Sequence, residues 1–197
     1  MAYPEFSLNG VQADFGITAT PAKLFQGLVP ADVPGWLRDQ LARGNLAPRV
    51  SEKARSEYIV APILLACSEL SGGEITVFSG SRLDADAARG LVGECDFLLA
   101  RAPAIPSVHA PILAVVEAKK GDIEAALGQC LAQALGAQLW NEREGKPLPA
   151  IYGCVTSGDV WQFLRLESST AFIDDRRYYL DNLPGILGVL AAIVRKG

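Results

Sequence analysis

The feature that most constrains the fold of this chain is an unbroken apolar run, Ile112 to Val116. Glu117 follows this run directly, and Lys119 lies two residues further on. A short run without a polar position is typical of a strand that is covered on both faces, whereas a strand with one solvated face alternates. Such a strand needs other elements packed around it. The sequence therefore predicts a covered sheet in which one buried strand, predicted at Ile112–Ala118, ends in a carboxylate and an ammonium group.

The runs on either side predict the elements that surround this strand. Ser51 is a good N-cap for a helix that ends before Gly72, and Pro62 is expected to kink this helix or to end its first half. A second long helix is predicted from Asp122 to about Asn141. Four further strands are predicted at Ile75–Phe78, Cys95–Ala100, Ile151–Val155 and Val160–Leu166. The order of these elements predicts an α/β or α+β fold with a mixed central sheet of about five strands flanked by helices.

The chain divides by composition into three parts. Residues 1–50 are rich in glycine and proline and are expected to form an N-terminal arm, packed on the core, with one short helix from about Val33 to Ala42. Residues 51–170 hold the predicted sheet and its helices. Residues 171–197 begin with charged residues and are expected to form a helical tail, with a helix from about Pro184 to Val194.

The charge of the chain argues against one class of nucleic-acid binding. The formal net charge is -4 and the sequence pI is near 5.1. A protein that holds nucleic acid by bulk charge presents a clustered positive surface instead. A nuclease is still compatible with this charge, because catalytic carboxylates add negative charge and a partner can hold the substrate.

The cysteines and the single histidine indicate no zinc or histidine-based site. Four cysteines lie in apolar runs without CxxC spacing, so they are expected to be small buried residues in a reducing compartment. His109 stands alone in a proline-rich loop, and no catalytic role is expected for it. Trp161 and Phe163 alternate along a predicted strand, which favours core packing over a platform for stacking bases.

The termini carry no feature of a membrane or exported protein. No basic stretch followed by an apolar run begins the chain, and the apolar segment Ile186 to Val194 is too short to span a bilayer. A cytoplasmic protein without a membrane partner is expected.

Three residues could form a catalytic centre. Glu117 and Lys119 are two apart on a strand, so their side chains point to the same face. Asp96 begins the preceding predicted strand, and it reaches the same point if the two strands pair. Two converging carboxylates suit Mg²⁺, and a neighbouring lysine can orient a water or stabilise a transition state at phosphorus. Taken alone, the spacing of Glu117 and Lys119 favours a structural ion pair.

Motif order adds to this reading. The segments GECDFLL and AVVEAKK are followed by a helix that carries Gln129 and Gln133. In this order the chain resembles the PD-(D/E)xK nuclease superfamily. It is more narrowly similar to the N-terminal nuclease domain of type I restriction enzyme R subunits, through the EKAR start of the first helix, the EAKK strand end and the hairpin at residues 152–163. The resemblance covers roughly residues 51 to 166 and implies a restriction-endonuclease-like core.

The resemblance implies roles for individual residues. Asp96 and Glu117 would be ligands of Mg²⁺ or Mn²⁺, and Lys119 the catalytic lysine. Gln133 would help to position the substrate or the water, with Gln129 as the weaker candidate. A glutamate on the first helix would also reach the metal.

Two glutamates compete for this last role. Glu52 shares a helical face with Ile59 and Ile63, which are expected to pack on the sheet, whereas Glu57 points away from that face. Glu52 is therefore preferred as the third metal ligand. The alternative for either glutamate is a solvated residue of the first turn.

The chain departs from the family pattern at several positions. Cys95 stands where the motif name has proline, and Ala137 stands where relatives often carry an aromatic residue after the glutamine. No G-x-x-x-x-G-K-[ST] motif is present, so ATP-driven translocation is not encoded in this sequence. The expected function is cation-dependent hydrolysis of DNA, by the free protein, a homodimer or a subunit of a larger complex. The alternative is a catalytically silent protein of the same fold that serves as an interaction or homodimerisation module.

Overall fold

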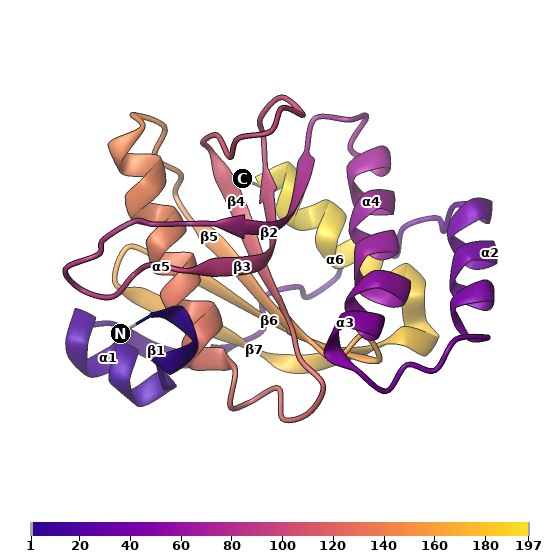
Figure 1. Cartoon of the computed structure of the whole chain (residues 1–197), viewed down its shortest axis with the longest axis horizontal. Coiled ribbons are helices and arrows are strands. Elements are labelled where there is room, and N and C mark those ends of the chain that lie inside the picture. Colours follow the sequence, from indigo (N-terminus) through magenta and orange to yellow (C-terminus); the bar gives the residue numbers. More distant parts are fainter. Residues whose placement is uncertain (1, 197) are drawn as a thin grey trace.

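The computed structural model describes residues 2–196, which form one mixed seven-stranded sheet with helices on both faces (Figure 1). The strand order is β1-β7-β6-β5-β4-β3-β2. β1 pairs with β7 and β4 with β5 in parallel, and the other neighbours are antiparallel. The strands are β1 (Thr18–Ala22), β2 (Thr76–Arg82), β3 (Glu94–Ala100), β4 (Ile112–Ala118), β5 (Ile151–Thr156), β6 (Val160–Glu167) and β7 (Thr170–Tyr179). The α/β class is confirmed.

All five strands predicted from the sequence are present, and two more extend the sheet beyond the expected number. β4 has the predicted bounds and is buried at every position. β1 and β7 were not expected, because Pro21 interrupts the first and the charged residues Asp174–Arg177 lie within the second. β1 lies at the edge of the sheet, where a proline is tolerated. The expected arm and the expected tail therefore both contribute strands to the sheet.

The helices form a layer on each face of the sheet. The long helix α5 (Leu127–Arg143) covers one face, together with the short helix η1 (Tyr3–Glu5) and α1 (Leu8–Phe15). The helices α4 (Ala61–Leu70) and α6 (Leu183–Lys196) cover the other, and α2 (Gly35–Gly44) packs outside α4. In Figure 1, α5 and α4 lie on opposite sides of the strands. Each face thus has its own apolar core.

The first long helix is continuous through a widened turn. Ser51 caps α3 (Glu52–Arg55) by accepting a hydrogen bond from the Ala54 amide, as its position predicts. A π-helical turn η2 (Ser56–Val60) follows, and α4 then continues the helix. Pro62 was expected to kink or end the helix. The π turn lies directly before it, where the ring and the missing amide of a proline are most disruptive.

The other helix bounds differ modestly from the predictions. α5 begins at Leu127 rather than at Asp122, whose carboxylate instead accepts from the amides of Glu124 and Ala125 in a preceding turn. α2 begins two residues later than expected, and η3 (Leu180–Asn182) precedes α6. In α6, the side chains of Ile186, Leu187 and Leu190 are buried.

Burial confirms the expectations for the cysteines and for the aromatic pair. All four cysteines are buried free thiols. Trp161 and Phe163 have no exposed surface and pack in the core on the α4 face. Among the described residues, no helix has the length and hydropathy that a bilayer crossing requires.

We expect Gly128→Ala to destabilise the protein, because the N-terminal segment crosses α5 at this residue. A Cβ at Gly128 would lie 2.3 Å from the carbonyl carbon of Ser7 and 2.5 Å from the carbonyl oxygen of Phe6, and backbone atoms cannot move away as a side chain can. Alanine is intrinsically favoured over glycine in a helix by about 1 kcal/mol. We nevertheless expect a net loss of about 2 kcal/mol in the free energy of unfolding, measured by urea denaturation.

Gly121→Ala is the matched control, because a Cβ at Gly121 would meet no atom within 4 Å. Equal stability of the two variants would show that the N-terminal segment is not held against α5.

Candidate active site

The register of β3 and β4 brings two acidic side chains together. Phe97 pairs with Val116 and Leu98 with Val115, so the next two residues, Asp96 and Glu117, lie directly opposite one another. Opposed residues of an antiparallel pair have side chains on the same face. The carboxyl groups of Asp96 and Glu117 accordingly lie on the same face at the point where the pairing of the two strands ends.

Asp96 also ends the ladder between the two strands. Its Oδ2 accepts a hydrogen bond of 2.7 Å from the amide of Ala118, a donor that would otherwise face β3. On its other side, β4 remains joined to β5, since the Lys119 amide donates to the Thr156 carbonyl at 2.7 Å. The end of β4 is thus held by β5 while it separates from β3. This separation leaves Asp96 half-buried beside a cleft.

Glu117 is a buried carboxylate with three hydrogen-bond donors. Its side chain is 3% exposed, and its Oε1 accepts from Lys119 Nζ at 2.6 Å. Gln129 Nε2 donates to the same oxygen at 2.6 Å, and Gln133 Nε2 donates to Oε2 at 2.8 Å. A buried carboxylate is costly without such partners. The two glutamines are four apart on α5 and therefore share the helix face that lies over β4 and β5.

The glutamines therefore contact Glu117 itself. Gln133 is fully buried, and its amide is bonded to the carboxylate rather than directed into open space. Gln129, the weaker candidate in the sequence, holds Glu117 in the same way. Their spacing of four residues on a helix that follows the E-x-K strand was the available signal. The sequence did not show that Glu117 lies beneath the first two turns of this helix, where both glutamines reach its carboxylate.

Burial and like charge change the acidity of the carboxyl pair. Burial, and then the charge of Asp96, raise the pKa of Glu117 to about 7. Burial also raises the pKa of Asp96, although the Ala118 amide and the charge of Lys119 oppose this. For Lys119, burial alone lowers the pKa, but the hydrogen bond and the charge of Glu117 raise it above its ordinary value. The lysine is therefore charged near neutral pH, and the two carboxyl groups favour a shared proton or another cation between them.

Glu52 lies at the mouth of the site. Its Oε2 accepts a hydrogen bond of 3.2 Å from the Lys120 amide, one residue beyond the catalytic-lysine candidate. The cleft at this point has a volume of about 310 Å³. It is lined by Glu52, Lys53, Ser56, Glu57, Ser79, Gly80, Glu94, Asp96 and Ala118.

Glu57 lines the same cleft, although uniform helical spacing directs it away from the packed face. The π turn begins at Ser56, so the angular spacing of the α-helix does not hold between Glu52 and Glu57. The hydrogen bond that Glu52 accepts from the Lys120 amide distinguishes the two glutamates.

Other candidate groups lie apart from this cleft. His109 is in the loop before β4, and its Nε2 is 2.8 Å from the Ser107 hydroxyl in an exposed pair. No group of three or more His, Cys, Asp or Glu side chains within residues 2–196 is arranged to hold a metal ion. The converging donors are the two carboxyl groups of Asp96 and Glu117.

Two carboxylates are nonetheless a donor set that fits Mg²⁺ or Mn²⁺. Mg²⁺ is commonly held by one or two carboxylates and keeps several waters, which phosphate oxygens can replace. The negative charge of Asp96, which together with burial raises the pKa of Glu117, would attract a cation, and cation binding would release the proton of Glu117. Lys119 and Gln129 both occupy Oε1 of Glu117, so a cation at that oxygen would replace at least one of them.

Comparison with known proteins assigns no family to the chain. No protein-family model matches the sequence, and a search of curated proteins finds no significant match.

We expect the opposed carboxyl groups to lower stability as the pH rises. Because the pKa of Glu117 is raised from its ordinary 4.5 to about 7, the stability it contributes is complete below pH 4.5 and is lost as the pH rises through about 7. Asp96→Asn removes the opposing charge and keeps an oxygen for the Ala118 amide. Its melting temperature should therefore exceed that of the wild type by a margin that grows between about pH 5 and pH 8.

Thermal denaturation across that range provides the measurement. Asp84→Asn is the control, because Asp84 is a more exposed carboxylate whose pKa is lowered by its hydrogen bond with Arg82. A margin for Asp96→Asn that stayed constant with pH would contradict the opposition of charge.

Proposed function

We propose that this protein is a divalent-cation-dependent nuclease that hydrolyses phosphodiester bonds in DNA, with a PD-(D/E)xK active site like that of type I restriction enzyme R subunits. The opposition of Asp96 and Glu117 at the point where β3 and β4 separate carries this proposal. Lys119 directly follows β4, and its ammonium group is hydrogen-bonded to Glu117. A carboxylate pair with an adjacent lysine is suited to phosphate chemistry and is otherwise an expensive arrangement to bury.

In the proposed reaction, Asp96 and Glu117 would hold Mg²⁺ or Mn²⁺, which when bound neutralises phosphate charge and increases the acidity of water. Lys119 presents an ammonium group to the oxygens of the scissile phosphate once it leaves Glu117. Gln129 and Gln133 keep the carboxylate of Glu117 in a fixed orientation through their amide groups. Glu52 adds a carboxylate at the mouth of the cleft.

The charge of the cleft supports dependence on a cation. Its lining includes Glu52, Glu57, Glu94 and Asp96 but one basic side chain, Lys53. Such a surface repels phosphate unless positive charge is added. A bound divalent cation supplies that charge, which reconciles a net charge of -4 with a nucleic-acid substrate.

We expect the purified protein to cut DNA in the presence of Mg²⁺ or Mn²⁺ and Lys119→Ala to reduce the rate of cutting by about 100-fold or more, because the ammonium group at the phosphate is lost. Cleavage of a labelled duplex and of a single strand is the assay, and circular dichroism verifies that the variant is folded. Isothermal titration with Mn²⁺ measures cation binding separately.

Lys120→Ala is the matched control for Lys119→Ala. The adjacent lysine has an exposed side chain, and its contact with Glu52 is made by the backbone amide, which the substitution preserves. We expect it to cut within about threefold of the wild type. The proposed activity would be contradicted by wild-type protein that neither binds Mn²⁺ nor cuts DNA.

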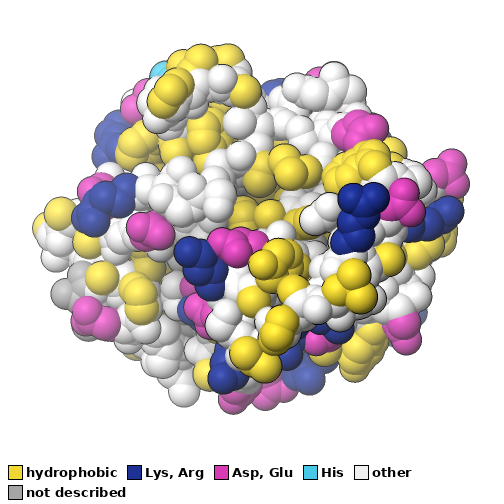
Figure 2. Space-filling model, turned by 45° about the vertical axis from the view of Figure 1, so that its right-hand side comes forward, with side chains coloured by type: hydrophobic (Ala, Val, Ile, Leu, Met, Phe, Trp, Pro, Cys, Tyr) yellow, Lys and Arg dark blue, Asp and Glu magenta, His cyan; other side chains and the backbone are white. Residues whose placement is uncertain are grey.

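The second candidate is a catalytically silent protein of this fold that binds a partner or itself. An exposed apolar patch at Ile186, Leu187 and Leu190 would support this role, but these side chains are buried. Exposed apolar side chains lie instead on α2, on α4 and between these two helices. They are Trp36, Leu46, Val50, Leu65 and Leu70. Figure 2, which brings the right-hand side of Figure 1 forward, shows hydrophobic side chains in several patches among polar ones. This candidate predicts stable self-association in light scattering and no cation-stimulated cleavage.

The proposed cellular setting follows from the cysteines. Four buried free thiols fit a reducing compartment, so we propose a cytoplasmic location. DNA, a second copy of the chain or a larger complex remain the proposed partners.

A further inference from the structure

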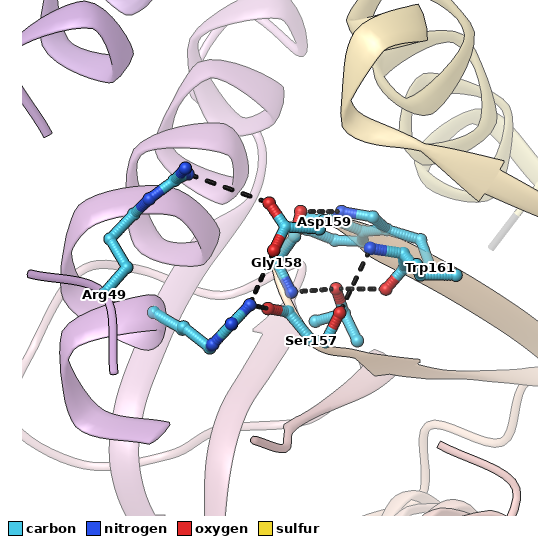
Figure 3. A network of polar contacts seen from close by, with 8 residues as sticks. Arg49, Ser157, Gly158, Asp159 and Trp161 are labelled. Atoms are coloured by element: carbon cyan, nitrogen blue, oxygen red, sulfur yellow. Dashed lines mark hydrogen bonds and ion pairs between the residues drawn. The ribbon is translucent and has the colours of Figure 1, made fainter. Parts of the chain in front are cut away.

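The turn between β5 and β6 is fixed by its own hydrogen bonds. The Thr156 hydroxyl accepts from the Gly158 amide at 2.8 Å and donates to the Val160 carbonyl at 2.9 Å. On the far side, Trp161 Nε1 donates to the Gly158 carbonyl at 2.9 Å. Gly158 has a φ of 83°, which glycine adopts without strain. Figure 3 shows this turn between Arg49 on one side and the ring of Trp161 on the other.

Arg55 joins this turn to α3. One nitrogen, Nη1, donates to the Ser157 carbonyl at 2.9 Å and to Asp159 Oδ2 at 2.6 Å. The Arg55 side chain is 23% exposed, so this charge-assisted contact is partly shielded from water. Arg49 lies 3.7 Å from the other carboxylate oxygen of Asp159 and makes a weaker contact from outside the helix.

The same turn is also joined to the strand that carries the candidate catalytic residues. The residue before it, Thr156, accepts the Lys119 amide at its carbonyl and pairs with Ala118 in the sheet. Glu52 lies three residues before Arg55, on the same side of the α3 turn, and its carboxylate accepts from the Lys120 amide. One rigid turn therefore holds the segment with Glu52 on one side and the segment with Lys119 on the other.

We propose that Arg55, acting through the β5–β6 turn, is a positioning residue that holds Glu52 at the mouth of the cleft. This inference rests on the proposed function for its catalytic consequence. α3 has four residues and is followed at once by the π turn, so the helix alone does not fix the direction of Glu52. The contact between Arg55 and Asp159 anchors the helix one turn after Glu52.

The test compares Arg55→Gln with Arg55→Lys and with Arg49→Gln. Arg55→Gln removes the charge that holds the turn, so kcat for Mn²⁺-dependent cleavage should fall about 10- to 100-fold, with KM within about twofold. Arg55→Lys keeps the charge and several donors, and it should recover kcat to within about threefold of the wild type. Arg49→Gln removes a charge from the same carboxylate and should leave kcat unchanged.

A second readout does not depend on activity. The amide resonance of Lys120 in a nitrogen-15 spectrum reports its bond to Glu52. In Arg55→Gln it should move to the position that it has in Glu52→Ala, and in Arg49→Gln it should stay at the wild-type position. If Arg55→Gln does not fold, Asp159→Asn breaks the same ion pair from the turn and is measured in its place.

Two results would overturn the inference. Either the Lys120 resonance and kcat of Arg55→Gln match those of the wild type, or Arg49→Gln shows the same losses as Arg55→Gln. Wild-type protein without cleavage would refute the proposed function instead, and the Lys120 resonance would then still decide whether Arg55 positions Glu52.

Discussion

The buried carboxylate of Glu117 is the constraint on which the rest of the site depends. Folding places it opposite Asp96, where little water remains to separate two like charges. Lys119 and two amide groups from α5 offset this cost. Two apolar residues at these positions would complete the sheet without needing hydrogen-bond partners for a buried charge. A local conflict of this kind, compensated by its surroundings, is characteristic of functional sites rather than of structural cores.

The sheet order brings the compensating groups to one place. β4 and β5 are parallel neighbours, so a crossover must join them, and α5 is that crossover. It covers the face toward which Glu117 points and presents its glutamines there. The turn after β5 is joined to α3 by the hydrogen bond from Arg55 to the Ser157 carbonyl. Three segments that are distant in the sequence therefore meet at the end of one buried strand.

Sequence patterns predicted the apolar strands of this sheet better than the strands that contain proline or charged residues. β4 was predicted with its observed bounds because every one of its residues is apolar or belongs to the site. β1 was missed because an edge strand tolerates proline, and β7, which lies between β1 and β6, was missed because its charged run Asp174–Arg177 is a signal against a buried strand. Similarly, the direction of Glu57 could not be predicted, since a π turn interrupts the helical spacing on which the prediction relied.

By itself, the sequence determined what depends on near neighbours along the chain. The alternation of a strand places Glu117 and Lys119 on one face, and Ser51 begins its helix, because both effects act within a few residues. Only the tertiary structure decided that Asp96 lies opposite Glu117, that Gln129 and Gln133 both reach this carboxylate, and that Arg55 is bound to the β5–β6 turn. These contacts join residues 12 to 104 positions apart, and strand register and helix packing fix them rather than local preference.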